Sequence, residues 1–215
     1  AWTLETGRPI LALVSTGLGS WLVFGAMAEL WQRAARTPAR LARLPRADWG
    51  KALAHGGFGV VMAGIGLLMA GQVEDIRVAK EGETFTVAGY QITLDKVEEV
   101  PGPNYTSHMA TMEVHRDGKL ITTLHPEKRI YPVQAMPTTE ADIDNGLFRD
   151  VYLVVGDPQE GGGWAVRTYI KPFATWIWAG CLIMALGGVF SLSDRRYRVA
   201  AGARKTAPAN VQPAE

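Results

Sequence analysis

The sequence contains a single cysteine, Cys181, which lies inside an apolar run. One cysteine excludes an intramolecular disulfide framework, a CxxC redox pair and a cysteine-ligated zinc site. Because apolar surroundings disfavour a thiolate, we expect Cys181 to serve only in packing. The chain has no GxSxG motif, and the glycine run at 161–163 lacks the Lys and Ser or Thr of a phosphate-binding loop. The formal net charge of +1 gives no indication of nucleic-acid binding, and we expect no nucleic-acid partner.

Charged residues are absent from three long stretches, 10–28, 52–73 and 172–193, which contain 19, 22 and 22 residues. An α-helix needs about 20 predominantly apolar residues to cross the hydrocarbon core of a bilayer. The sequence therefore predicts an α-helical membrane protein with three transmembrane helices, in contact with membrane lipid.

The distribution of charge predicts how these helices are oriented. Residues 33–51 carry six basic residues and one acidic residue, and 194–205 carry five basic residues and one acidic residue. Residues 72–172 carry 10 basic and 16 acidic residues, a net charge of 10 − 16 = −6. Because basic residues concentrate in short cytoplasmic segments, we expect the acidic block to lie outside the cytoplasm.

These features divide the chain into six expected segments. They are a first transmembrane helix with a short outer N-terminus (1–32), a basic cytoplasmic loop (33–51), a second transmembrane helix (52–73), an extracytoplasmic β-rich domain (74–171), a third transmembrane helix (172–193) and a basic, disordered cytoplasmic tail (194–215).

The acidic block has the patterns of short β-strands. Apolar residues alternate with polar ones over 90–97, and Asp117-Gly118 is a tight-turn dipeptide between two further alternating segments. A continuous apolar run at 151–155 is typical of a central strand, whereas 138–146 favours one helical turn. We expect an inserted small antiparallel β domain, either a barrel or a sandwich.

His55 is the ionisable residue inside the second apolar run. An ionisable side chain within a membrane span indicates a functional site, and neutral imidazole is a good iron ligand. Gly59, Met62 and Gly66 follow at spacings that share the face of His55 on a helix. This surface of small residues suits a flat porphyrin, but it equally suits close helix packing, and a proton or ion path is a third possibility.

The other three histidines, His108, His115 and His125, fall in the acidic block. They have no HxH or HxxxH spacing, so we expect surface histidines rather than a metal site. No second histidine occurs in the three apolar runs, and a haem with two histidine ligands would need the other from outside this sequence.

Several long strings resemble the C-terminal part of the CcmF family, the large membrane subunit of bacterial cytochrome c haem lyase. They are GPNYTS (102–107), PEKRIYPVQAMPTTEADI (126–143), DVYLVVGD (150–157), WAVRTYIKP (164–172), WIWAGCLIMALGG (176–188) and SDRRYR (193–198).

The resemblance implies a role in joining haem to apocytochrome c at the outer face of the bacterial inner membrane, with the β domain in the periplasm. It implies haem delivery by the chaperone CcmE and presentation of apocytochrome c by CcmH-type subunits. It places His55 at one of two histidines that hold a transmembrane b haem, the other lying in the remainder of CcmF. The tryptophan-rich segment of the family is not found here, so we expect this chain alone to be inactive.

Two other functions remain open from the sequence. One is a non-enzymatic membrane-anchored adaptor whose outer β domain docks a partner protein. The other is a piece of a transporter in which His55 lies on a proton path.

Overall fold

The computed structural model describes residues 8–133 and 136–194. These residues form two compact units. Among the described residues, one unit contains Val14–Ala63 and 176–194, and the other contains 8–13 together with the described part of Gly64–Thr175. The first unit is helical, and the second contains the β-strands.

Three helices are long and apolar enough to cross a membrane, as the sequence predicts. They are α2 (Arg8–Arg33), α4 (Arg46–Gly71) and α5 (Ala174–Leu192), with a four-residue helix α3 (Pro38–Leu41) between the first two. Helix α4 begins at Arg46, immediately after Pro45 and six residues before the start that the charge-free run indicates. Helical backbone hydrogen bonds do not require apolar side chains, so the helix extends into the charged segment.

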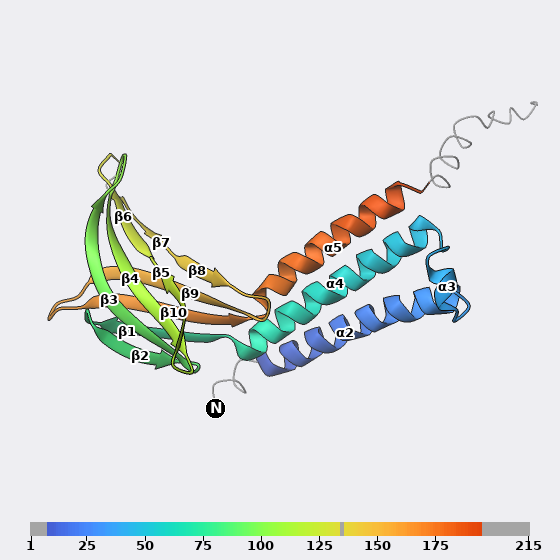
Figure 1. The fold of residues 1–215 in the computed structure, drawn as a ribbon, viewed down its shortest axis with the longest axis horizontal. Helices are drawn as coiled ribbons and strands as arrows, with labels where there is room; N and C mark the ends of the chain where they lie inside the picture. The colour runs from blue at the N-terminus through green and yellow to red at the C-terminus, as the bar shows by residue number, and fades with distance from the viewer. Residues whose placement is uncertain (1–7, 134–135, 195–215) are drawn as a thin grey trace, which may run out of the picture. The chain divides into compact units, whose positions relative to one another are not determined.

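Glycines set the packing in the helical unit, where α4 lies between α2 and α5 (Figure 1). A Cβ atom on Gly59 would lie 2.6 Å from the carbonyl oxygen of Gly19 in α2. A Cβ atom on Gly57 would lie 2.7 Å from the backbone nitrogen of Met184 in α5. The backbones approach so closely only because both positions lack side chains, which is a common basis of helix association in membranes.

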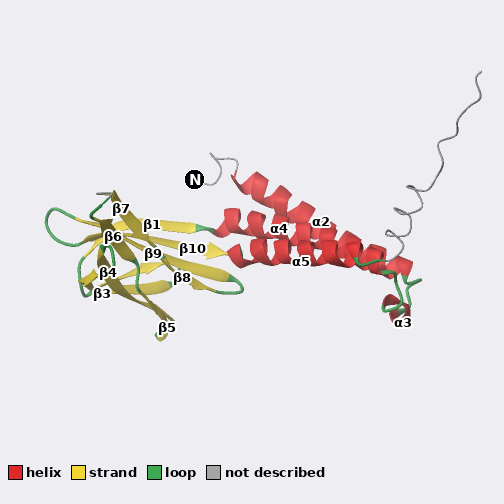
Figure 2. Cartoon of the chain, turned by 90° about the horizontal axis from the view of Figure 1, so that it is seen from above, coloured by secondary structure: helices red, strands yellow, loops and turns green. Residues whose placement is uncertain are grey.

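The strands form two antiparallel sheets, drawn in yellow in Figure 2. Their bounds are β1 (Val73–Ala79), β2 (Glu83–Val87), β3 (Tyr90–Pro101), β4 (Thr106–Arg116), β5 (Lys119–Leu124), β6 (Glu127–Tyr131), β7 (Met136–Glu140), β8 (Asp142–Asn145), β9 (Arg149–Pro158) and β10 (Trp164–Pro172). The first sheet has the order β1-β10-β9-β8. The second has the order β2-β3-β4-β6-β7, with β5 also paired to β4.

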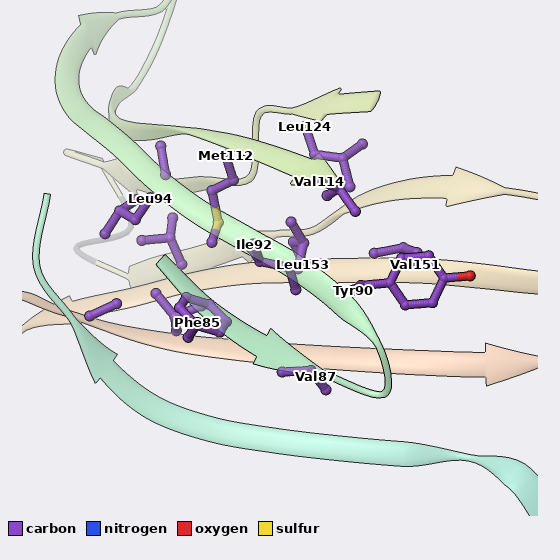
Figure 3. Close-up of a cluster of buried hydrophobic side chains, with 14 of the residues drawn as sticks. Phe85, Val87, Tyr90, Ile92, Leu94, Met112, Val114, Leu124, Val151 and Leu153 are labelled. Carbon is purple, nitrogen blue, oxygen red and sulfur yellow. The ribbon is translucent and has the colours of Figure 1, made fainter. Parts of the chain in front are cut away.

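One hydrophobic core lies between the two sheets (Figure 3). The second sheet contributes Ile92 and Met112, and the first sheet contributes Val151 and Leu153, all with no exposed surface. Their alternation with more exposed neighbours follows from the two-residue period of a strand. The expected small antiparallel β domain is therefore a sandwich rather than a barrel.

The expected helical turn at 138–146 is wrong, because this segment contributes to two strands instead. Thr138 in β7 lies opposite Arg129 in β6, and Ile143 in β8 lies opposite Tyr152 in β9. Pairing with strands that are distant in sequence overrides the weak local helical preference.

Candidate functional site

His55 lies on an exposed surface of α4, nine residues after its first residue, Arg46. Its ring nitrogen Nδ1 is 2.9 Å from the carbonyl oxygen of Lys51, one turn earlier in the same helix. A carbonyl oxygen only accepts hydrogen bonds, so Nδ1 is the donor and carries the proton. In the neutral ring, Nε2 then has a free lone pair, and it has no hydrogen-bond partner within the described ranges.

A pocket of about 500 Å³ adjoins His55 within the helical unit. Four of its lining residues are ionisable and come from one end of α2 and α4: Arg33, Asp48, Lys51 and His55. The others are small: Ala47, Gly50, Ala54, Gly187, Gly188 and Ser191. The histidine is therefore beside a space with little side-chain volume.

Four charged residues at this end of the helices pair with one another. The guanidinium of Arg33 contacts Glu29 at 3.0 Å and Asp48 at 2.7 Å, and Lys51 also pairs with Glu29. Two cations and two carboxylates form one network, so the pocket has no excess charge from them. In the sequence, Arg33 and Lys51 indicate only the membrane topology. The i,i+4 spacing of Glu29 and Arg33 is the one sequence pattern that indicates an ion pair at this place.

The face predicted to accompany His55 is occupied in part by another helix. Gly59 is buried against Gly19 of α2, and the carbonyl oxygen of Met62 accepts a hydrogen bond from Ser15 Oγ at 2.7 Å. Helix packing, one of the three alternatives considered for this surface, therefore accounts for Gly59. A flat group beside His55 would lie against the pocket-lining surface instead.

The histidines of the β domain lie apart from this site in sequence and have other contacts. The rings of His108 and Trp164 are in tilted contact, with centroids 5.2 Å apart, and His115 Nε2 is 3.9 Å from a carboxylate oxygen of Glu113. The backbone N–H of His125 donates to Asp142 at 2.7 Å. Across residues 8–133 and 136–194, no three metal-ligating side chains cluster.

Cys181, which the sequence predicts to serve only in packing, is exposed on α5. The helix is apolar around its circumference, so one face packs on α4 while others are left for lipid.

A second hollow, of about 370 Å³, lies on the outward face of the first sheet. Tyr152 and Tyr169 line it as a T-shaped pair with ring centroids 5.5 Å apart. Lys171 Nζ lies 4.4 Å from the centroid of the Tyr152 ring, and Ile76 at the rim is 60% exposed. The lining thus combines a tyrosine pair with Arg167, residue types that are enriched in protein interfaces.

Comparison with known proteins gives consistent results. Residues 70–172 match the family described as the CcmF C-terminal β-sandwich. The chain is 73% identical over 214 residues to the cytochrome c-type biogenesis protein ccl1 of Rhodobacter capsulatus, covering 100% of this chain and 33% of that protein. It is 40% identical over 211 residues to the cytochrome c-type biogenesis protein CcmF of Escherichia coli, covering 98% of this chain and 32% of that protein.

A solved structure named cytochrome c heme lyase CcmF shares the fold, with a TM-score of 0.62 and 19% identity. That match covers 86% of this chain and 34% of the solved chain. The chain thus spans about one third of the length of the relatives it matches. Three membrane helices, a β-sandwich and these identities together assign the chain to the CcmF family of bacterial membrane proteins, where it is similar to the C-terminal part of its members.

Proposed function

We propose that this chain provides the C-terminal part of a cytochrome c haem lyase subunit, and that His55 is one axial ligand of a transmembrane b haem. The proposal is supported mainly by the hydrogen bonding of the His55 ring. Its Nδ1 proton is held by the Lys51 carbonyl, while Nε2 has no partner among the described residues and the ring borders an open pocket.

The residues present fit one side of such a haem. Histidines that bind metals characteristically donate their second N–H to a carbonyl or carboxylate, which fixes the tautomer and the ring orientation. Lys51 supplies that acceptor to His55. The other three histidines of the sequence belong to the β domain, so the second ligand would come from the remainder of the protein. A bound b haem would supply one-electron transfer between ferric and ferrous iron.

We propose further that the β-sandwich lies in the periplasm and acts as a scaffold for covalent haem attachment to apocytochrome c. The net charge of −6 over 72–172 supports this side of the membrane, because the short flanking segments are basic. The expected partners are the remainder of CcmF, the haem chaperone CcmE, CcmH-type subunits and apocytochrome c. This chain alone lacks the family's tryptophan-rich segment, so we expect it to be inactive without the remainder.

The test is substitution of His55 by Ala in the complete protein, followed by a reduced-minus-oxidised absorption spectrum of the purified membrane complex. We expect loss of the b-type absorption bands. The matched control is His125→Ala, which removes an exposed histidine of the β domain and should leave the bands intact. Unchanged b-type bands in the His55→Ala protein would refute the ligand assignment.

A second candidate function is a membrane-anchored adaptor whose β domain docks a partner protein. The hollow lined by Tyr152 and Tyr169 on the outward sheet face favours it. Tyr152→Ala with Tyr169→Ala should then abolish co-purification of a CcmH-type subunit. The control, Tyr105→Ala, removes a ring that lies just before β4 and pairs with Tyr131 of the second sheet. Equal co-purification from all variants would exclude docking at this face.

A further inference from the structure

The β8–β9 tip, defined as Gly146, Leu147 and Phe148, is joined to the first turn of α5. The backbone N–H of Phe173, the residue before α5, donates to the carbonyl oxygen of Phe148 at 3.0 Å. Thr175 Oγ1, in the second residue of α5, donates to the carbonyl oxygen of Gly146 at 2.9 Å. The tip therefore reaches the level at which the membrane-spanning helix begins.

A buried carboxylate holds the tip in this position. Asp150 is only 8% exposed, and its Oδ1 accepts a hydrogen bond from the Gly146 N–H at 3.1 Å. Its Oδ1 also lies 3.2 Å from Thr175 Oγ1, whose single proton is shared between this carboxylate and the Gly146 carbonyl. A Cβ atom on Gly146 would lie 2.5 Å from the Arg149 carbonyl oxygen, so the turn is also tight. These contacts hold the tip beside the first residues of α5.

The side chains at the tip are apolar and exposed. Leu147 is 64% exposed and Phe148 is 59% exposed. Hairpin tips in water are normally built from Gly, Asn, Asp, Ser and Pro. The opposite end of β9 follows that rule, since the β9–β10 tip reads Gln159-Glu160-Gly161-Gly162-Gly163. The two ends of one strand thus differ in polarity, and the apolar end is the one beside the span.

Cationic and aromatic groups lie next to the apolar tip. Phe148 and Phe173 form an edge-to-face pair with ring centroids 6.0 Å apart. In register, Lys171 lies opposite Asp150, and Arg149 lies opposite Pro172, next to the tip. Arg149 is also ion-paired with Asp144 of β8. Apolar and aromatic side chains at the hydrocarbon boundary with Lys or Arg beside them form the pattern of interfacial membrane anchors.

We infer that the β8–β9 tip inserts Leu147 and Phe148 into the headgroup–acyl boundary of the bilayer that α5 crosses, and so anchors the β-sandwich to the membrane surface. The lipid is chosen over a protein partner because the tip is hydrogen-bonded to the first turn of a membrane-spanning helix. The inference does not depend on haem binding by His55.

The test uses the full chain with Cys181→Ser, which removes its native thiol, and a nitroxide spin label on Leu147→Cys. The chain is reconstituted in liposomes of phosphatidylcholine and phosphatidylglycerol, and collisions of the label with oxygen and with a water-soluble nickel chelate are measured by electron paramagnetic resonance. We expect collisions with oxygen to persist and most collisions with the chelate to be lost. A label on Phe148→Cys should behave in the same way.

Two control labels give the collision rates expected in water and in lipid. A label on Glu160→Cys, at the other end of a strand that is roughly 30 Å long at the usual rise per residue, should collide freely with the chelate. A label on Leu182→Cys, which is 67% exposed on α5, reports the lipid-facing limit. Free access of the chelate at Leu147→Cys would overturn the inference, and so would shielding from both reagents, which would mean that protein covers the tip.

Discussion

The hydroxyl of Thr175 donates a hydrogen bond to the carbonyl oxygen of Gly146 at 2.9 Å and thereby joins the first turn of α5 to the β8–β9 tip. The two residues are 29 positions apart in the sequence. Both also bond to the buried carboxylate of Asp150. This three-residue cluster is a polar connection between the β8–β9 tip and the first turn of α5, next to the backbone hydrogen bond from Phe173 to Phe148.

Thr175→Val should destabilise the β domain. The substitution keeps the shape of the side chain but leaves the Gly146 carbonyl without this donor and Asp150 with one donor fewer. We expect a loss of about 1–3 kcal/mol in the free energy of unfolding. Urea unfolding of the chain in detergent, followed by near-ultraviolet circular dichroism, measures it. Thr175→Ser retains the hydroxyl and is the control; equal midpoints for the Val and Ser variants would contradict the role of this bond.

Gly59→Ala should weaken the packing of α4 on α2. Its Cβ would lie 2.6 Å from the carbonyl oxygen of Gly19, a backbone atom that cannot turn away. We expect a cost of about 1–3 kcal/mol from overpacking. The matched control is Gly25→Ala in α2, where a Cβ meets nothing within 4 Å. Titration with sodium dodecyl sulfate from mild detergent micelles compares the unfolding midpoints, and a Gly25 variant less stable than the Gly59 variant would refute the packing argument.

Thr168→Val should stabilise the β-sandwich. Thr168 has no exposed surface, and its Oγ1 has no hydrogen-bond partner among the residues that the structure describes. Replacing an unsatisfied hydroxyl by a methyl group of similar size removes a desolvation cost, with an expected gain of about 1 kcal/mol. Thermal unfolding monitored by circular dichroism tests this. Thr86→Val, on an exposed position of β2, should change the midpoint little; a destabilised Thr168→Val protein would show that the hydroxyl has a partner.

The ion pair of Asp75 and Arg77 should make the stability of the β domain depend on pH. A hydrogen bond from Arg77, at 2.5 Å, lowers the pKa of Asp75 below its ordinary value of 3.8, and the attraction of the two charges lowers it further. Because the pKa is lower in the folded state, the contribution to stability is present above the unfolded pKa and is lost as the pH falls through the folded one.

The thermal midpoint of the β domain should therefore fall more steeply for the native chain than for Asp75→Asn between about pH 5 and pH 2. At neutral pH the Asn variant should be slightly less stable, since the pair is partly exposed and screened. Asp95→Asn, for which no ion pair occurs among the described residues, is the control. Parallel pH profiles for the native chain and Asp75→Asn would contradict this prediction.

Some of the strand structure was predictable from neighbouring residues and some was not. Ile92 and Leu94 alternate with polar residues, and both are fully buried in β3, as a half-buried strand requires. Residues 138–146 have no such alternation, and their strand structure depends on pairing with β6 and β9. An alternating pattern of side chains indicates which face of a strand is buried. It does not indicate which distant strand will pair with it.

The candidate site was predictable only in part, for a similar reason. An ionisable residue in an apolar run identifies His55 from local composition alone. The face of Gly59 was assigned to the same surface by helical spacing, yet it packs against Gly19 of another helix. Helical period places residues on one side of a helix, whereas the neighbouring helix decides which of them remain accessible.

Membrane spans and the presence of short strands could be inferred from the order of residues, because a bilayer and a pleated strand each act on a few consecutive side chains. The pairing of the strands into a sandwich, the neutral ion network beside His55 and the Thr175–Gly146 contact could not be inferred in that way. Each depends on groups from separate segments meeting in space, and only the folded chain brings those groups within hydrogen-bonding or packing distance.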